Sequence, residues 1–307
     1  MVSLIIPCYN EQEVINTTYN RIKTVLINSN IDYEIIFIND GSKDNTLIIL
    51  SELAKTDTNV KVLSFSRNFG HQPAVTAGIS HCKGNMAIIM DADLQDPPEL
   101  IPQMIEIAEK NNCNVVYGVR INRKGETWFK KFTAKMYYNL LNYLSDVDIP
   151  KNTGDFRLID RKVIDEFKKL GEKNKYIRGL ISWVGFKQMP IYYERESRLM
   201  GETKYPLSKM LKFASNGLIY FTKKPLNIAI TLGFISVLLG LILTGYVFFS
   251  KYFQPLTTVP GWASTLIIII FFGGVQLLSI GVLGKYIACI FDEVKNRPEY
   301  IIEEQIN

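Results

Sequence analysis

Two long stretches without a charged residue constrain this 307-residue chain more than any other feature. They run from Pro225 to Ser250 and from Tyr252 to Gly284. Each exceeds the roughly 20 apolar residues that a helix needs to cross a bilayer. A buried core helix of a soluble protein is the alternative, but such helices are rarely so long. The sequence therefore predicts two transmembrane helices within residues 225–287.

Basic residues flank these stretches and predict their orientation. They precede the first stretch and follow the second: Lys209, Lys212, Lys223, Lys224, Lys285, Lys295 and Arg297. The connection between the stretches, Lys251–Pro260, holds a single lysine. Under the positive-inside rule, the N-terminal domain and both termini lie in the cytoplasm. We expect a multi-pass protein of the cell (inner or plasma) membrane.

The N-terminal half alternates strand and helix signals. Strands are expected at Val2–Pro7, Ile35–Ile38, Val60–Phe65, Met86–Met90 and Asn114–Gly118. Helices are expected at Glu11–Asn28, Thr46–Ala54, Gln72–Ser80 and near Glu99–Lys110. Apolar strands alternating with amphipathic helices predict an α/β domain with a Rossmann-like, mostly parallel sheet. In such domains ligands bind beyond the carboxyl ends of the strands.

One of these strand ends carries two carboxylates. The apolar run Met86–Met90 stops at Asp91, and Asp93 follows two positions later. Oxygen ligands of this kind suit Mg²⁺ or Mn²⁺, which share them with substrate phosphates. The pair is therefore a candidate site for a metal and a pyrophosphate. The alternative is that Asp93 or Asp96 only caps the following helix.

Two common nucleotide-binding motifs are missing from the sequence. A Rossmann dehydrogenase would have G-x-G-x-x-G after the first strand, where this chain has Cys8–Gln12. The chain has no Walker A motif either. A nucleotide would thus be held by carboxylates and a metal rather than by a glycine-rich loop.

Four segments of the chain resemble a known family. They are Ile5–Glu11, Asn39–Asp44, Ser66–His71 and Asp91–Pro98. With the two C-terminal stretches, they make the chain similar to the family 2 (GT-A fold) glycosyltransferases. Within that family it resembles the polyprenyl-phosphate glycosyltransferases, the group of bactoprenol glucosyltransferases and dolichol-phosphate mannose synthases. The resemblance implies an inverting, metal-dependent enzyme that uses a nucleotide sugar.

The resemblance also implies roles for individual residues. The base and ribose of the nucleotide would be held by Pro7, Tyr9, Glu11 and Asp40. Asp91 would lie near the ribose and the metal, Asp93 would be the principal metal ligand, and Gln95 would lie close to the diphosphate. His71 is one of two histidines. We expect it to be structural, because the resemblance assigns it no proton transfer.

A further group of candidate residues follows the predicted sheet. Asn152–Leu158 reads as a polar turn, and it resembles the family's catalytic segment, which places Asp155 at the reacting centre. Arg198 and Lys204 match a family loop that closes over the donor pyrophosphate. Two glutamates among these cations leave open which arginine acts, and a solvated charge run is the alternative.

Two basic, aromatic-rich stretches have the spacing of amphipathic helices. They lie at about residues 127–144 and 206–224. We expect both at the membrane interface, with core packing as the alternative. Arg120, Arg123 and Lys131 are the candidates for binding the phosphate of a lipid acceptor, because positive charge at the interface attracts that headgroup.

The predicted layout has four parts. Residues 1–205 form a cytoplasmic catalytic domain, 206–224 a juxtamembrane helix, 225–287 the two transmembrane helices and 288–307 a cytoplasmic tail.

The predicted reaction is transfer of glucose from UDP-glucose to undecaprenyl phosphate, giving a β-linked lipid-phosphate sugar for cell-envelope glycan modification. The acceptor phosphate is largely dianionic near neutral pH, so Asp155 would orient the acceptor or the sugar rather than abstract a proton. UDP-N-acetylglucosamine or another donor is the nearest alternative. A processive polysaccharide synthase or a non-catalytic membrane scaffold is a more distant one.

The expected partners follow from the same resemblance. They are the nucleotide sugar, the polyprenyl phosphate and the membrane, together with a flippase and a downstream transferase if the product is used outside the cell membrane. We expect a homo-oligomer, with a tetramer among the candidates, and no nucleic-acid partner.

Overall fold

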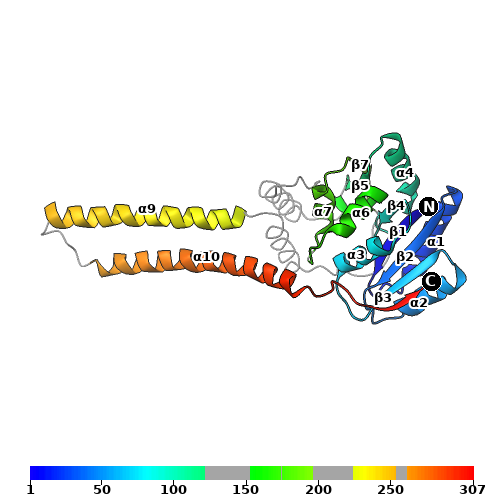
Figure 1. Cartoon of the computed structure of the whole chain (residues 1–307), viewed down its shortest axis with the longest axis horizontal. Helices are drawn as coiled ribbons and strands as arrows, with labels where there is room; N and C mark the ends of the chain where they lie inside the picture. Colours follow the sequence, from blue (N-terminus) through cyan, green and yellow to red (C-terminus); the bar gives the residue numbers. More distant parts are fainter. Residues whose placement is uncertain (122–152, 174, 196–223, 254–260) are drawn as a thin grey trace. The chain divides into compact units, whose positions relative to one another are not determined.

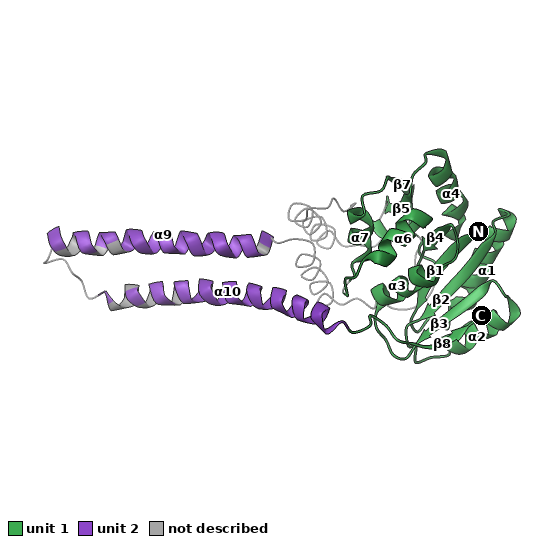
Figure 2. Cartoon of the chain, in the orientation of Figure 1, with its two compact units in different colours: residues 1–142, 147–210, 297–307 green, residues 143–146, 211–296 purple. Residues whose placement is uncertain are grey.

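The computed structural model describes residues 1–121, 153–173, 175–195, 224–253 and 261–307 (Figure 1). These residues fall into two compact units, coloured separately in Figure 2. The first unit holds the described residues up to 195 together with Arg297–Asn307. The second unit holds the described residues between 224 and 296. The amphipathic helices predicted at residues 127–144 and 206–224 lie outside the described residues, apart from Lys224.

One sheet of eight strands runs through the described part of the first unit. The strands are β1 (Val2–Cys8), β2 (Tyr33–Asn39), β3 (Val60–Phe65), β4 (Met86–Ile89), β5 (Val115–Arg120), β6 (Thr153–Asp160), β7 (Gln188–Tyr193) and β8 (Ile302–Ile306). Their order across the sheet is β7-β5-β6-β4-β1-β2-β3-β8. Strands β4, β1, β2 and β3 are parallel, β7 is parallel to β5, and β6 and β8 are antiparallel to their neighbours. The predicted α/β fold with a mostly parallel sheet is confirmed.

Helices cover both faces of this sheet (Figure 1). They are α1 (Ile15–Asn28), α2 (Thr46–Thr56), α3 (His71–His81), α4 (Ile101–Lys110), α6 (Arg161–Lys169) and α7 (Ile177–Trp183), with a short 3-10 helix η1 (Pro98–Leu100) before α4. Helices α1, α2 and α4 share one apolar cluster with alternate residues of β1 and β2. Helix α3 packs on β1 and β2, and α6 packs on α3 and α7. Burial on both faces explains why β1 and β2 are apolar almost without interruption.

Helix α3 lies so close to the sheet that one of its positions requires glycine. A Cβ atom on Gly78 would collide with the Ile5 side chain and approach Ile38 Cδ1 to 3.1 Å. This close packing fixes the height of α3 above β1 and β2. His71, the first residue of the helix, is thereby held near the carboxyl ends of those strands.

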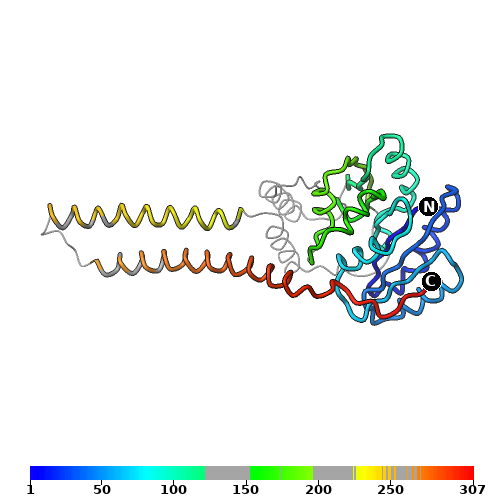
Figure 3. The backbone as a smooth tube through the Cα atoms, viewed as in Figure 1, coloured from blue at the N-terminus to red at the C-terminus, as the bar shows by residue number. Residues whose placement is uncertain are grey.

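Three strands, β6, β7 and β8, were not expected from the sequence. The prediction of a polar turn over Asn152–Leu158 is wrong, because strand β6 begins at Thr153 and pairs on both sides, with β4 and β5. Its polar side chains Asp155 and Arg157 are buried, which hid the strand pattern. Strand β8 follows the second apolar stretch and pairs antiparallel with β3 (Figure 3). The segment Ile302–Ile306 has polar residues at its centre, as an exposed edge strand does.

The second unit contains the two predicted apolar helices. Helix α9 spans Lys224–Phe253 and α10 spans Trp262–Lys295. Each contains a window that is long and apolar enough to cross a membrane, Leu226–Leu243 and Phe271–Lys295. None of the residues in these windows is buried in the described structure, unlike those of a core helix in a soluble protein. By length and composition both helices suit a bilayer.

A buried carboxylate ties together the amino ends of the central strands. Glu34 of β2 accepts hydrogen bonds from Ser3 Oγ at 2.5 Å and from the Lys83 backbone N–H at 2.6 Å. Lys61 Nζ of β3 lies 2.5 Å from its other oxygen. Burial raises the pKa of Glu34, but the bonds from Lys61, Ser3 and Lys83 outweigh burial and hold the pKa below its ordinary value. Glu34 is therefore ionised and joins three strands to the loop before β4.

We predict that Glu34→Ala destabilises the protein by about 3–5 kcal/mol, because it leaves the half-buried Lys61 and the buried donors of Ser3 and Lys83 without their acceptor. Thermal unfolding of the full-length protein in detergent measures this as a lower Tm. Because the pKa of Glu34 is lowered by folding, its contribution is present above about pH 4.3 and is lost as the pH falls through the folded-state value. The Tm difference between wild type and variant should thus shrink below about pH 4.

The matched control is Glu166→Ala. Glu166 forms an exposed ion pair with Lys169 at 2.6 Å, and such pairs contribute at most about 1 kcal/mol. Equal Tm values for Glu34→Ala and Glu166→Ala would show that the Glu34 cluster does not hold the strands.

Candidate active site

The topology brings most of the predicted site residues to one edge of the sheet. The loops after β1, β2 and β4 carry Tyr9, Asp40 and Asp91, and parallel strands end at the same edge. Strand β6 runs in the opposite direction and pairs Arg157 with Ile89 of β4, so its first residues reach that edge beside Asp91. Arg120 ends β5 at the same edge. Sequence-distant residues thus meet there.

Asp155 is held between two cationic side chains. Arg178 Nε lies 2.6 Å from Asp155 Oδ1 and Arg178 Nη2 lies 3.1 Å from Oδ2. His71 Nε2 lies 3.0 Å from Oδ2. Burial raises the pKa of Asp155, but the charge of Arg178 and the hydrogen bonds from His71 and Arg178 outweigh it and hold the pKa well below its ordinary value. Asp155 is therefore a fixed anion and a poor proton acceptor.

His71 is the second cation of this arrangement. Burial lowers the pKa of His71, but the hydrogen bond to Asp155 and the charges of Asp91 and Asp155 raise it to about 9. At neutral pH the imidazole is doubly protonated and donates to Asp155. This charge state agrees with the expectation that His71 is not a catalytic base.

The helices that carry these cations are joined to each other. His71 is the first residue of α3 and Arg178 the second residue of α7. The backbone N–H of Ile177 donates to Gln72 Oε1 at 2.9 Å, and Arg178 Nη1 donates to the Thr153 carbonyl at 3.1 Å. The two helix starts and the start of β6 therefore form one hydrogen-bonded group.

Asp91 and Asp93 form the part of the site that favours a cation. Burial, together with the neighbouring carboxylates of Asp96, Asp93 and Asp155, raises the pKa of Asp91 to about 6 against the opposing charge of His71. The Asp91 side chain is about one-third exposed, and its Oδ1 lies 3.9 Å from His71 Nε2. Asp93 Oδ1 accepts the backbone N–H of Gln95 at 3.2 Å. A divalent ion here would relieve the repulsion between carboxylates.

The donor set fits a metal that also binds substrate phosphates. Among the described residues, no group of three or more metal-binding side chains is present. Mg²⁺ sites in phosphate-transfer enzymes commonly use one or two carboxylates, with substrate phosphates and water completing the shell. Asp91 and Asp93 match that arrangement.

The turn that carries these carboxylates is strained and anchored. Leu94 has a φ of 55°, a left-handed conformation that is unfavourable for a leucine, and its side chain is buried. Thr18 Oγ1 of α1 donates to the Ala92 carbonyl at 2.7 Å. Helix α1 thus holds the backbone between Asp91 and Asp93 in place.

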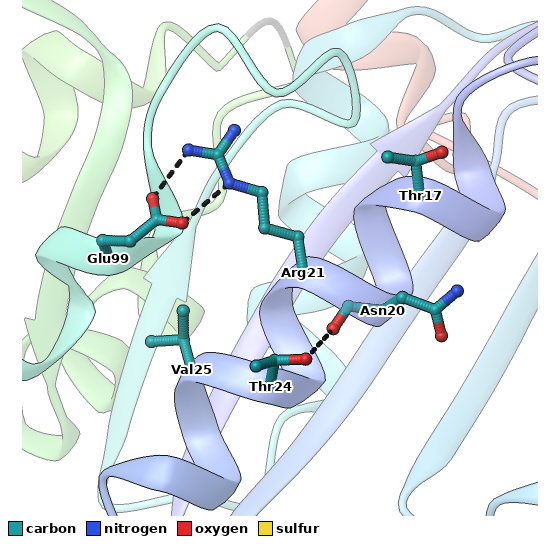
Figure 4. A pocket seen from close by; sticks show the side chains of 6 residues that line it. All are labelled: Thr17, Asn20, Arg21, Thr24, Val25 and Glu99. Carbon is teal, nitrogen blue, oxygen red and sulfur yellow. Dashed lines mark hydrogen bonds and ion pairs between the residues drawn. The ribbon is translucent and has the colours of Figure 1, made fainter.

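A second anchor from α1 holds the far end of the same segment. Arg21 makes two bonds to Glu99, with Nε to Oε1 at 2.7 Å and Nη2 to Oε2 at 2.8 Å. This ion pair borders a surface depression of about 420 Å³ that Thr17, Asn20, Thr24 and Val25 also line (Figure 4). The depression contains none of the clustered carboxylates, and its charged groups satisfy each other. We therefore regard it as a surface feature and not as the active site.

Arg120 shares its charge with a buried carboxylate. Its Nη2 lies 3.3 Å from Asp96 Oδ1, and its Nε lies 3.2 Å from Tyr193 Oη. The Tyr193 hydroxyl also donates to Asp96. The guanidinium packs over Gly154, where a Cβ atom would collide with Nη2. Arg120 thus lies next to β6, with part of its charge neutralised.

The predicted nucleotide-side residues lie in loops that are bonded to each other. Both Asp40 oxygens accept backbone N–H groups, from Phe69 at 2.6 Å and Gly70 at 2.9 Å. The Glu11 N–H donates to Thr46 Oγ1 at 2.9 Å. Pro7, Tyr9 and Gln95 are half-buried at this edge. These residues therefore lie at the same sheet edge as Asp91.

Four predicted residues lie outside the described residues: Arg123, Lys131, Arg198 and Lys204. Sequence analysis missed Arg178 and Tyr193, which neutralise or hydrogen-bond the buried carboxylates. Arg178 lies in a seven-residue helix with no recognisable motif, and only its distance from Asp155 reveals its role.

Comparison with known proteins relates this chain to a family and to several of its members. Residues 3–168 match the family model of glycosyl transferase family 2. The "Uncharacterized glycosyltransferase YkcC" of Bacillus subtilis is 51% identical over 98% of this chain and 93% of its own. The bactoprenol glucosyl transferase of Shigella phage SfII is 40% identical over 99% of this chain and 97% of its own. Crystalline glucosyl-3-phosphoglycerate synthase from Mycobacterium tuberculosis, with Mn²⁺, UDP and glucosyl-3-phosphoglycerate, gives a TM-score of 0.49 at 17% identity, over 71% of this chain and 77% of that one.

We predict that His71 carries both ring protons at pH 7.5 and loses one only near pH 9. The chain has two histidines, so NMR of histidine-labelled protein in detergent resolves His71 against His81. Because folding raises this pKa above the ordinary 6.5, the stabilising effect of His71 is complete below about pH 6.5 and is lost as the pH rises through 9. Asp155→Asn should lower the His71 pKa, since it removes the main partner.

A His71 that is neutral at pH 7.5 would contradict the charge arrangement around Asp155. Asp165→Asn, which changes an exposed carboxylate on α6, is the control and should leave the His71 titration unchanged.

Proposed function

Since the chain belongs to glycosyl transferase family 2, we propose that it transfers a sugar from a nucleoside diphosphate sugar to a polyprenyl phosphate. The observation that supports this most is that two sets of carboxylates with different surroundings lie at one sheet edge. Asp155 is neutralised by Arg178 and His71, and Asp91 and Asp93, which follow the adjacent strand β4, would hold a cation. Relatives named bactoprenol glucosyl transferase, about 39–40% identical over nearly the full chain, support the lipid acceptor.

The donor half of the proposed site is the Asp91–Asp93 turn. These carboxylates would hold Mg²⁺ or Mn²⁺, with Asp93 as the principal ligand, and the bound ion would stabilise the charge that develops on the nucleoside diphosphate leaving group. Gln95 would lie near the diphosphate. Pro7, Tyr9, Glu11 and Asp40 would surround the nucleoside, in loops that are bonded to one another.

Asp155 lies at the proposed reacting centre, where the sugar of the donor meets the acceptor phosphate. A phosphomonoester with a second pKa of roughly 6 is largely dianionic at neutral pH and is a nucleophile without a general base. An ionised Asp155 suits this chemistry, because it accepts hydrogen bonds and does not take a proton. We assign Asp155 to orienting the sugar hydroxyls. A carboxylate accepts hydrogen bonds from hydroxyl groups, whereas it repels a phosphate. A single displacement of this kind inverts the anomeric centre.

Cationic groups complete the proposal. Arg120 borders Asp155 through Gly154, and with Arg123 and Lys131 it would attract the acceptor phosphate. Arg198 and Lys204 would close over the donor pyrophosphate.

UDP-glucose is the proposed donor, since the relatives that are named by reaction are glucosyl transferases.

The membrane anchor fits the lipid acceptor. Helices α9 and α10 suit a bilayer, and the basic residues on their outer flanks favour a cytoplasmic location for the N-terminal domain and both termini. A polyprenyl phosphate at the membrane surface would then be accessible to the same chain that binds the soluble nucleotide sugar.

The test is sugar transfer by the full-length protein with undecaprenyl phosphate and Mg²⁺. UDP-glucose, UDP-N-acetylglucosamine and GDP-mannose are supplied in separate labelled reactions, and label that enters the organic phase is counted. We expect UDP-glucose to give the highest rate. Chelation by EDTA should abolish transfer, and added Mg²⁺ or Mn²⁺ should restore it. Asp93→Asn should lower kcat on the order of 100-fold or more, because a metal ligand is lost.

The matched control is Asp165→Asn, an equivalent change at an exposed carboxylate, which should retain the wild-type rate. No lipid-linked label from any donor would contradict the proposed reaction. Transfer that persists in EDTA would contradict the metal site.

A further inference from the structure

The C-terminal segment belongs to the same unit as the proposed active site. Residues Arg297–Asn307 follow α10 in the chain and form part of the first unit. Strand β8 pairs with β3 (Figure 3). Before the strand begins, Glu299 and Tyr300 contact two segments that lead to the cations holding Asp155.

The first contact reaches His71. Tyr300 stacks on Phe65, with ring centroids 5.0 Å apart and planes at 11°. Phe65 meets Phe69 edge to face at 5.7 Å, and Phe69 lies two residues before His71. The Tyr300 hydroxyl also lies beside Ser80 in the last turn of α3. The tyrosine therefore contacts the end of β3 and the end of α3, and it reaches the turn before α3 through Phe65.

The second contact reaches Arg178. Glu299 Oε1 lies 2.8 Å from Lys175 Nζ, and the two side chains are only 12% and 9% exposed. Lys175 lies three residues before Arg178, in the segment that leads into α7, and its Nζ lies 5.6 Å from the centre of the Phe167 ring. The ion pair thus fixes the start of α7 against the C-terminal segment.

We infer that Glu299 and Tyr300 are positioning residues, which align Arg178 and His71 on the Asp155 carboxylate from outside the catalytic site. The inference rests on the proposed function. Neither residue touches Asp155, and they act on its two partners by separate routes. A displacement of about 1 Å in a catalytic group can lower the rate up to 100-fold, so loss of these contacts should lower turnover.

Other contacts attach the C-terminal segment to the sheet. The β8 backbone pairs with β3 over Val62–Phe65. Asn307 Nδ2 donates to the carbonyls of Ala54 at 2.6 Å and Val60 at 3.0 Å. Asn307 therefore secures the far end of the tail without contacting either route, and it provides the matched control.

The test compares Tyr300→Leu with Asn307→Ala in the full-length protein. We expect Tyr300→Leu to lower kcat about 5- to 20-fold with little change in the donor KM, since nucleotide-binding groups do not move. It should also shift the NMR cross peak of His71. Asn307→Ala should lower the Tm but keep the wild-type kcat and the His71 cross peak.

A charge exchange tests the second route. Lys175→Glu alone should lower kcat by a similar factor, and adding Glu299→Lys should restore it to within about threefold of wild type, because the ion pair is rebuilt in reverse. The kcat values are compared at a temperature well below the Tm of every variant, so that loss of folded protein does not contribute to the difference. If Tyr300→Leu does not fold, the Lys175→Glu variant and its double variant with Glu299→Lys test the inference.

The inference is overturned if the Tyr300 and Lys175 variants reduce kcat no more than Asn307→Ala does, or if the charge exchange gives no rescue. If the wild-type protein transfers no sugar, the proposed function fails. The His71 cross peak then still shows whether the tail positions that side chain.

Discussion

The ion cluster around Asp155 is the interaction on which the rest of the site depends. One buried carboxylate receives two bonds from Arg178 and one from His71. An unpaired charge at this depth would be strongly unfavourable, so the three groups must be placed together. They come from β6, α7 and α3, and their alignment requires the close packing of α3 on the sheet at Gly78. The fold thus brings the three charged groups together, and the buried charge of Asp155 in turn requires that fold.

The carboxylates of the site fall into two groups that differ in position and in contacts. Asp155 and Asp96 have arginine partners in the described structure, Arg178 and Arg120. Asp91 and Asp93 follow β4 at the same edge, and burial together with the neighbouring carboxylates raises the pKa of Asp91 to about 6 against the charge of His71. A cation and a diphosphate fit at Asp91 and Asp93, whereas Asp155 suits the neutral hydroxyls of a sugar. One sheet edge can thus bind a metal-linked donor and orient the group that is transferred.

The sequence predicts strands β1 to β5 and misses β6, β7 and β8. Strands β1 to β4 are apolar runs in a parallel sheet, where burial on both faces leaves a clear signal, and Asp91 lies at the end of one. Strand β6 carries Asp155 and Arg157, whose burial depends on partners that no local pattern reveals. Arg178 is missed for the same reason, since its meaning lies in a contact across 23 residues of sequence. The role of the tail depends on β8 pairing with a strand some 240 residues earlier.

The most direct test of this division of roles is Mn²⁺ binding in the presence of UDP, followed by electron paramagnetic resonance on the full-length protein. The account predicts that Asp93→Asn weakens Mn²⁺ binding by at least about tenfold, as expected for loss of a ligand, whereas Asp155→Asn leaves it within about threefold of wild type. Equal loss of Mn²⁺ affinity in both variants, or loss only in Asp155→Asn, would contradict the assignment of the metal to Asp91 and Asp93.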